Sequence, residues 1–99
     1  MSNPAYFFLE IDIHDHDAMK PYLEKAGATL AEFGATPVIL NGPPAHLEGD
    51  APLGNVVALR FDSMAQALAW YNSSSYREIL PHRLNAATNR AYFVEGIAA

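Results

Sequence analysis

Arg83 is the residue best placed to bind a ligand, because aromatic residues precede it at short intervals along the chain. The three aromatic residues are Trp70, Tyr71 and Tyr76. A guanidinium always carries charge and can bind a carboxylate through two hydrogen bonds, and aromatic rings commonly form the walls of ligand pockets. Together these residues predict a pocket for a small carboxylated or aromatic molecule.

A structural role is the alternative for the same residues. Arg83 could stack on an aromatic ring, or pair with Glu48 or Glu78 and so join a helix to a loop. The three aromatic rings could serve core packing first, with only the tyrosine hydroxyl groups left to orient a ligand. Both interpretations stay open at the level of the sequence.

Glu10, Asp12 and His14 form a second candidate group, because they alternate along one predicted strand. At a rise of about 3.3 Å per residue, their side chains project from one face about 7 Å apart. Carboxylate and imidazole groups so placed could act as acid and base or bind a divalent metal ion. The alternative is a polar strip that is solvated or paired across a subunit interface. We predict no metal site, because His14 and His16 are the only histidines at a suitable spacing and they flank a helix cap.

Glu48 is a third candidate, in the least regular part of the chain. It follows His46 by two residues, within a stretch rich in proline and glycine from residue 41 to residue 54. Loops of that length are more often functional than idle, so Glu48 could act as a base on a lid. The alternative is a charge that is simply exposed to solvent.

The elements that would position these residues begin with a strand over residues 5–14. One face of this strand carries the apolar residues Phe7, Leu9, Ile11 and Ile13, and the other carries Tyr6, Phe8 and the polar candidates. An amphipathic helix follows and ends at Gly34. Pro21 lies either in its first turn or marks a start near Lys20.

Two further strands and a helix are expected next. Residues 36–40 predict a short strand in which Pro37 marks either the start of the strand or an edge of the sheet, and residues 55–61 predict the next strand. Ser63 and Gln66 match a capping box, in which each side chain binds the other's backbone amide, so a helix begins there and runs to about Tyr71.

The chain is expected to close with a short helix and a strand. Ser73 or Ser75 caps the helix, which is interrupted or kinked at Pro81. Asn89-Arg90 then turns the chain into a last strand over residues 91–97. The order β-α-β-β-α-β predicts an α+β, ferredoxin-like domain, with a four-stranded antiparallel sheet and both helical regions on one face.

The uncovered face of this sheet predicts a homodimer. Tyr6 and Phe8 fall on that face, and a monomer would rarely expose such apolar side chains together. Two sheets packed face to face would cover them.

Length and composition limit the remaining possibilities. The 99 residues form one domain, residues 1–99, with 51 % hydrophobic content and no cysteine for a thiolate, a disulfide or an iron–sulfur cluster. A net charge of −5 with only six Lys and Arg argues against nucleic-acid binding. No apolar run approaches the ~20 residues of a membrane helix, so we expect a cytoplasmic protein without a membrane partner. The sequence contains no nucleotide, flavin or zinc-hydrolase motif, so we expect no cofactor.

Several separated motifs resemble those of the DUF1330 family of small bacterial proteins. They are Ala67-x-x-Trp70-Tyr71-x-Ser73-x-x-Tyr76, Arg83, Leu47-Glu48-Gly49, Tyr22 and Val94-Glu95-Gly96. The resemblance spans essentially the whole chain. It implies a dimeric α/β barrel, in which two ferredoxin-like sheets face each other with the helices outside. It also implies kinship in fold with antibiotic-biosynthesis monooxygenases and muconolactone isomerases, and no established activity.

Two positions depart from the family's pattern. Met19 stands where relatives commonly have tyrosine, so an aromatic wall is expected to be thinner there. His14-Asp15-His16 stands where relatives usually have one aspartate followed by proline. Any role of His14 or His16 would therefore be particular to this chain.

The sequence thus predicts a small dimer that binds a carboxylated or aromatic metabolite between sheet and helices. Its candidate ligand contacts are Arg83, Trp70, Tyr71, Tyr76, Asp12, His14 and Glu48. Enzyme activity without a cofactor is one interpretation of such a pocket. The alternative is a non-catalytic module in which these residues serve only folding and dimerisation.

Overall fold

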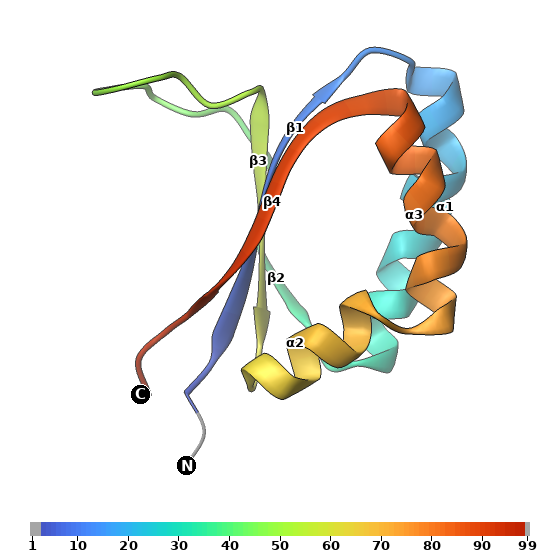
Figure 1. Ribbon diagram of the computed structural model, residues 1–99, viewed down its shortest axis with the longest axis vertical. Helices are drawn as coiled ribbons and strands as arrows, with labels where there is room; N and C mark the ends of the chain where they lie inside the picture. Colours follow the sequence, from blue (N-terminus) through green and yellow to red (C-terminus); the bar gives the residue numbers. More distant parts are fainter. Residues whose placement is uncertain (1–2, 99) are drawn as a thin grey trace.

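The computed structural model describes residues 3–98, which form a sheet with helices on one of its faces (Figure 1). The elements are β1 Ala5–Ile13, α1 His16–Glu32, β2 Thr36–Gly42, β3 Asn55–Phe61, α2 Met64–Tyr71, α3 Ser74–Ala86 and β4 Ala87–Glu95. All strand pairs are antiparallel, in the order β2-β3-β1-β4. The predicted α+β, ferredoxin-like architecture is confirmed. None of the helices in residues 3–98 is long and apolar enough to cross a membrane.

The core lies between the sheet and the helices, as the alternation along β1 predicts. Phe7, Leu9 and Ile11 are buried on the helix-facing side of β1. Tyr6 and Phe8 are half-buried on the opposite side, over which no helix lies in Figure 1. The register of β1 with β4 places Tyr92 opposite Phe8, and their ring centroids are 5.8 Å apart. This uncovered side of the sheet therefore carries an aromatic strip, and we call it the open face.

Helix α1 begins directly after Asp15, whose carboxylate accepts a hydrogen bond from the amide of Ala18 at 3.0 Å. The alternative start near Lys20 is therefore wrong, because an aspartate cap stabilises an earlier start by about 1 kcal/mol. Pro21 lies in the second turn, not the first, and removes one backbone hydrogen bond there. The chain leaves the helix through Gly34, whose φ of 67° is readily adopted only by glycine.

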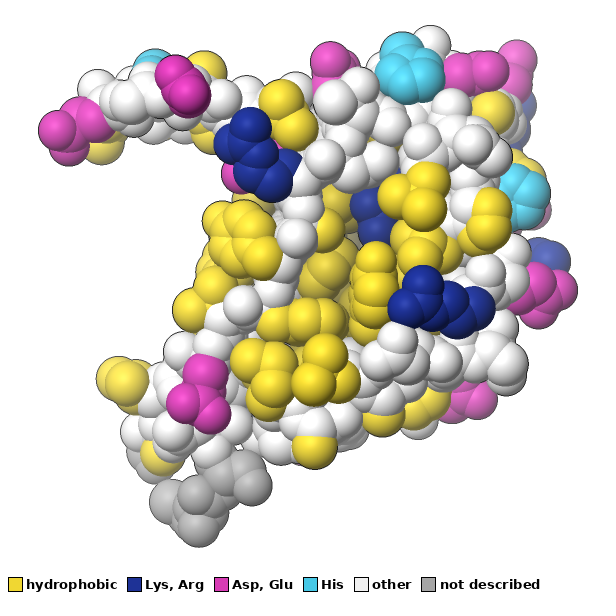
Figure 2. Space-filling model, in the orientation of Figure 1, with side chains coloured by type: hydrophobic (Ala, Val, Ile, Leu, Met, Phe, Trp, Pro, Cys, Tyr) yellow, Lys and Arg dark blue, Asp and Glu magenta, His cyan; other side chains and the backbone are white. Residues whose placement is uncertain are grey.

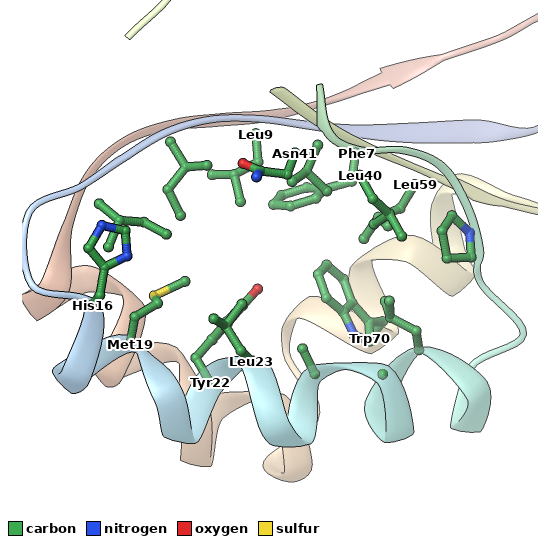
Figure 3. Close-up of a pocket in the computed structure, with 17 residues that line it drawn as sticks. Phe7, Leu9, His16, Met19, Tyr22, Leu23, Leu40, Asn41, Leu59 and Trp70 are labelled. Atoms are coloured by element: carbon green, nitrogen blue, oxygen red, sulfur yellow. The ribbon is translucent and has the colours of Figure 1, made fainter. Parts of the chain in front are cut away.

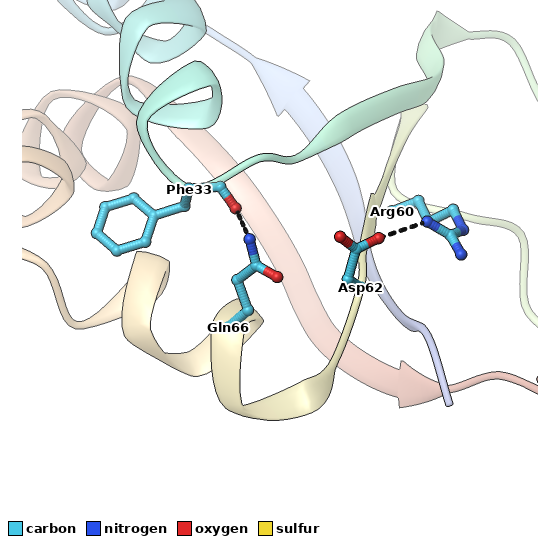
Figure 4. Close-up of polar contacts among 4 residues, drawn as sticks. All are labelled: Phe33, Arg60, Asp62 and Gln66. Atoms are coloured by element: carbon cyan, nitrogen blue, oxygen red, sulfur yellow. Dashed lines mark hydrogen bonds and ion pairs between the residues drawn. The ribbon is translucent and has the colours of Figure 1, made fainter. Parts of the chain in front are cut away.

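Ser63 and Gln66 confirm half of the predicted capping box. The Ser63 hydroxyl accepts a hydrogen bond from the Gln66 amide at 3.1 Å, so α2 begins where the sequence predicts. The Gln66 side chain does not bind the amide of Ser63. It donates instead to the carbonyl oxygen of Phe33, just after α1 (Figure 4). This hydrogen bond joins the start of α2 to the end of α1.

Helix α3 has Ser73 as its cap, which decides between the two serines proposed from the sequence. The Ser73 hydroxyl accepts a hydrogen bond from the amide of Tyr76 at 3.2 Å. The helix continues through Pro81 and is not interrupted there.

Strand β4 begins directly at the end of α3, so the predicted turn at Asn89 and Arg90 is wrong. Both residues lie in the ladder between β1 and β4, opposite Ile11 and Glu10. The amides of the two residues after β1 donate to the carbonyl oxygen of Ala86 at 3.0 and 3.1 Å, which fixes the junction without a loop. The strand also ends at residue 95, two residues earlier than predicted.

Strand β2 is the predicted strand with Pro37, and it lies at an edge of the sheet and extends to Gly42, two residues further than expected. Residues 43–54 project away from the sheet on the side opposite the helices (Figure 1). At the base of this projecting loop, the Leu53 amide donates to Glu10 Oε1 at 3.0 Å. Gly54 lies so close to β1 that a Cβ there would be 2.3 Å from the Ile11 carbonyl oxygen.

Replacing Ser63 with alanine is expected to lower the free energy of unfolding by about 1 kcal/mol, because the Gln66 amide loses its side-chain acceptor. Chemical denaturation followed by circular dichroism measures this loss. Ser74→Ala is the matched control, since Ser74 is an exposed serine at the first position of α3 and the cap there is Ser73. An equal loss in the two variants would contradict the assignment of Ser63 as the cap.

Candidate functional site

A cavity of about 530 Å³ lies between the sheet and α1 (Figure 3). Helix α1 packs along α3 and stands off from the sheet, which leaves this space open. Strands β1, β2 and β3 and helices α1 and α2 all contribute to its walls. Most lining side chains are apolar, among them Phe7, Leu9, Met19, Leu59 and Trp70. A cavity of this size and character is typical of sites for small organic ligands.

Polar side chains interrupt the apolar lining at a few places: His16, Tyr22 and Asn41. In Figure 3 the Tyr22 hydroxyl points into the cavity from α1, His16 lies at one end of it, and Asn41 lies across from α1. None of the three was predicted from the sequence as a ligand contact. Tyr22 was part of the family motif but had no role. Asn41 has a φ of 53°, and an Asn-Gly pair is a known signal for such a bend.

Tyr22 belongs to a buried chain of hydrogen bonds that reaches Arg83. The Tyr22 hydroxyl oxygen lies 2.8 Å from that of Tyr76, and Arg83 Nη2 donates to the Tyr76 hydroxyl at 3.2 Å. The guanidinium carbon of Arg83 also lies 5.5 Å from the centroid of the Tyr22 ring. This series of hydrogen bonds therefore starts on α3, crosses to α1 and ends at the wall of the cavity.

Arg83 is a buried cation without an acidic partner. Its side chain is 1 % exposed, and it forms no ion pair within residues 3–98, so the pairing with Glu48 or Glu78 does not occur. Its Nε and Nη1 atoms are buried and have no hydrogen-bond partner among the described residues. A buried donor left unpaired costs about 1–3 kcal/mol. The fold therefore carries this guanidinium at a cost in stability.

The surroundings of these hydrogen-bonded residues keep Tyr76 neutral and Arg83 charged. Burial raises the pKa of the Tyr76 hydroxyl well above its ordinary value, and the adjacent Tyr22 hydroxyl adds to the rise. For Arg83, burial lowers the pKa and the two tyrosine oxygens together raise it by more, so that it lies above its ordinary value. A fixed positive charge thus stands behind a neutral hydroxyl that contacts Tyr22.

Trp70 lines the cavity, whereas Tyr71, Tyr76 and Arg83 do not. The indole ring of Trp70 packs on Tyr76 with ring centroids 4.1 Å apart, and its Nε1 donates to Thr29 Oγ1 at 3.1 Å. Tyr71 is half-buried, and the guanidinium carbon of Arg77 lies 4.7 Å from the centroid of its ring. The four aromatic and cationic candidates are therefore close together, but only Trp70 faces the cavity.

The remaining sequence candidates lie apart from this cluster. Asp12 is exposed and lines a shallow depression of about 310 Å³, His14 is exposed just after β1, and Glu48 is exposed in the projecting loop. Glu10 pairs with Arg90 at 3.5 Å on the open face, so it serves that face and the base of the loop. Between residues 3 and 98 there is no group of three or more side chains that could hold a metal ion.

Solved structures share this fold. RPA0582, a protein of unknown function from Rhodopseudomonas palustris, is 18 % identical, with a TM-score of 0.77 over 100 % of this chain and 86 % of that one. A conserved protein of unknown function from Bacteroides thetaiotaomicron VPI-5482 is 9 % identical, with a TM-score of 0.65 over 96 % and 99 % of the two chains. SnoaB, a cofactor-independent oxygenase from Streptomyces nogalater, is 10 % identical, with a TM-score of 0.57 over 99 % and 97 %. At these identities the likeness shows the fold alone.

No curated protein sequence matches this chain. The family comparison, in contrast, agrees with the motifs found in the sequence. The match to the domain of unknown function DUF1330 covers residues 4–97, which include Tyr22, the segment from Ala67 to Tyr76, and Arg83. The protein therefore belongs to the DUF1330 family.

Proposed function

We propose that the protein binds a small organic molecule, carboxylated or aromatic, in the cavity between the sheet and α1. The cavity is the observation that carries this proposal. Its volume of about 530 Å³ is several times that of the roughly 150 Å³ apolar cavity that accommodates benzene in an engineered protein. Its apolar walls would hold a hydrocarbon skeleton, and its few polar groups would orient the molecule.

We also propose that the site acts on its ligand without a cofactor. His16 and Tyr22 are the lining residues whose side chains can hold or transfer a proton. SnoaB supports this proposal by analogy, because it is a cofactor-independent oxygenase with the same fold.

The candidate residues take different roles in this proposal. Trp70 forms part of the cavity wall, and Tyr76 and Arg83 act on the ligand through Tyr22. Tyr71 supports this arrangement, since its ring packs on that of Tyr76 with centroids 5.7 Å apart. Three candidates lie outside the cavity and receive no ligand contact: Asp12, His14 and Glu48.

Ala26→Leu is expected to weaken ligand binding, because Ala26 lines the cavity and a larger side chain would occupy part of it. The probes are benzoate, phenylacetate and 2-naphthoate, and the measurement is the rise in melting temperature that each produces. A ligand at ten times its Kd should raise the melting temperature of the wild type by roughly 5–10 °C. Ala28→Leu is the matched control, since Ala28 is exposed on the same helix and does not line the cavity.

The competing interpretation is a non-catalytic module. It has its own supporting observation, because Trp70, Tyr76 and Arg83 are each 1 % exposed or less, as core residues are. It predicts that none of the three acids raises the melting temperature of the wild type. That result would contradict the ligand-binding proposal, and a rise reduced only in Ala26→Leu would contradict the competing interpretation.

We further propose that the protein is a homodimer joined through the open face. Tyr92 and Val94 are 47 % and 44 % exposed there, beside the half-buried Tyr6 and Phe8. Figure 2 shows hydrophobic side chains on this side of the sheet, beneath the projecting loop. Such a patch is rarely left uncovered. A second copy suits it, because its own open face presents the same apolar side chains and an interface between two copies is self-complementary.

Tyr92→Glu is expected to convert the dimer to a folded monomer, because it would bury a carboxylate between the two sheets. Light scattering at micromolar concentration measures the molar mass. Leu68→Glu is the matched control, since Leu68 is 45 % exposed, a value close to that of Tyr92, but lies on α2 away from the open face. A monomeric wild type, or a loss of the dimer in Leu68→Glu alone, would contradict the proposed interface.

A further inference from the structure

We infer that Tyr22 donates its hydroxyl proton to an oxygen atom of the bound ligand, and that the ligand is an apolar molecule with a carbonyl, carboxylate or phenolate oxygen. This inference rests on the proposed use of the cavity as the ligand site. It assigns a direction to the hydrogen bonds between Arg83, Tyr76 and Tyr22, and the direction follows from which atoms can donate.

The first step of the chain is fixed by Arg83. A guanidinium has only donors, so the hydroxyl oxygen of Tyr76 must accept the hydrogen bond from Arg83 Nη2. The proton of the Tyr76 hydroxyl is then free to bind elsewhere.

The second step is fixed by the burial of Tyr76. Its side chain is 0 % exposed, and the hydroxyl of Tyr22 is the only other hydrogen-bond partner that its hydroxyl has among the described residues. If Tyr22 donated to Tyr76, the Tyr76 proton would be buried without an acceptor, at a cost of about 1–3 kcal/mol. Tyr76 is therefore the donor and Tyr22 the acceptor.

The third step follows at the cavity. Because the hydroxyl oxygen of Tyr22 accepts a hydrogen bond from Tyr76, the hydroxyl proton of Tyr22 must find an acceptor other than Tyr76 and Arg83. The hydroxyl of Tyr22 points into the cavity in Figure 3, and the walls around it are mostly apolar. An oxygen atom of the ligand is the acceptor that completes the series of hydrogen bonds from α3 to the cavity.

The charge of Arg83 strengthens the same preference. Successive hydrogen bonds polarise one another, so a guanidinium at the start of the chain makes the last hydroxyl a better donor. No carboxylate within residues 3–98 neutralises Arg83, and its field therefore favours a negative or partly negative oxygen at Tyr22. A ligand whose only polar group is an ammonium would be disfavoured on both grounds.

Two probes of nearly equal shape test the inference. 2-Acetonaphthone carries a carbonyl oxygen, and 2-isopropylnaphthalene replaces that carbonyl by a hydrocarbon group. Equilibrium dialysis measures the Kd of each. In Tyr22→Phe the affinity for 2-acetonaphthone is expected to fall about fivefold to tenfold, whereas the affinity for 2-isopropylnaphthalene stays within about twofold.

Tyr76→Phe separates the contribution of Arg83 and Tyr76 from that of the Tyr22 hydroxyl itself. This variant keeps the Tyr22 hydroxyl but removes its connection to Arg83, so it should weaken binding of the ketone by a smaller factor, about threefold. Tyr6→Phe is the matched control, because Tyr6 lies on the open face outside the cavity and its hydroxyl makes no hydrogen bond within the described residues. It should bind both probes as the wild type does.

The carbonyl stretching frequency of bound 2-acetonaphthone provides a test that needs no variant. A hydrogen bond from Tyr22 should lower this frequency below its value in hexane. A hexane-like frequency, or an equal effect of Tyr22→Phe on both probes, would overturn the inference while leaving the cavity as the ligand site. If neither probe binds the wild type but one of the three acids does, the affinities of the wild type and Tyr22→Phe are compared for that acid, and equal affinities overturn the inference. If no acid binds either, the use of the cavity itself is contradicted, and the inference falls with it.

Discussion

The position of α1 is the constraint on which the rest of the structure depends. This helix is held by the other two helices and not by the sheet. From α2, the Gln66 side chain donates to the carbonyl oxygen of Phe33, and the indole nitrogen of Trp70 donates to the Thr29 hydroxyl. From α3, the Ser75 hydroxyl donates to Glu32 Oε1 at 2.7 Å. Among residues 3–98 no side-chain hydrogen bond joins α1 to a strand. Because α1 stands off from the sheet, the space beneath it becomes a cavity where a tighter packing would have made a core.

This arrangement is costly for stability in two ways. The side chains that line the cavity lack the dispersion contacts that a closer packing of α1 on the sheet would give them. The unpaired nitrogen atoms of Arg83 add the cost of a buried charge without a counter-ion. Proteins commonly carry such costs at binding and catalytic sites, where stability and function oppose each other. The two features lie on either side of Tyr22.

The sequence predicted what depends on neighbouring residues. The alternation along β1, the cap at Ser63 and the strand that contains Pro37 are local features, and each was confirmed. The cap of α3 was narrowed to two serines, of which the structure has Ser73. The predictions were wrong where a residue distant in the sequence determines the local structure. Asn89 looks like a turn residue, but the ladder with β1 extends through it. The Gln66 side chain could accept a hydrogen bond from the Ser63 amide within its own turn. Its Nε2 donates instead to the carbonyl oxygen of Phe33, 33 positions away.

The candidate site was also predictable only in part, because the role of Arg83 depends on residues that are distant in the sequence. Three roles were open for Arg83 from the sequence: direct contact with a ligand, stacking on an aromatic ring, and pairing with a glutamate. The guanidinium carbon lies 5.5 Å from the centroid of the Tyr22 ring, whereas no ion pair of Arg83 occurs within residues 3–98 and the residue does not line the cavity. A guanidinium exposed in an apolar cavity would suit an anion but would be poorly solvated beside a neutral ligand. A guanidinium placed behind Tyr76 and Tyr22 avoids that cost, because the cavity sees only a hydroxyl. The charge then acts by fixing the direction of that hydroxyl's proton, a property that no pattern of residue types along the chain could reveal.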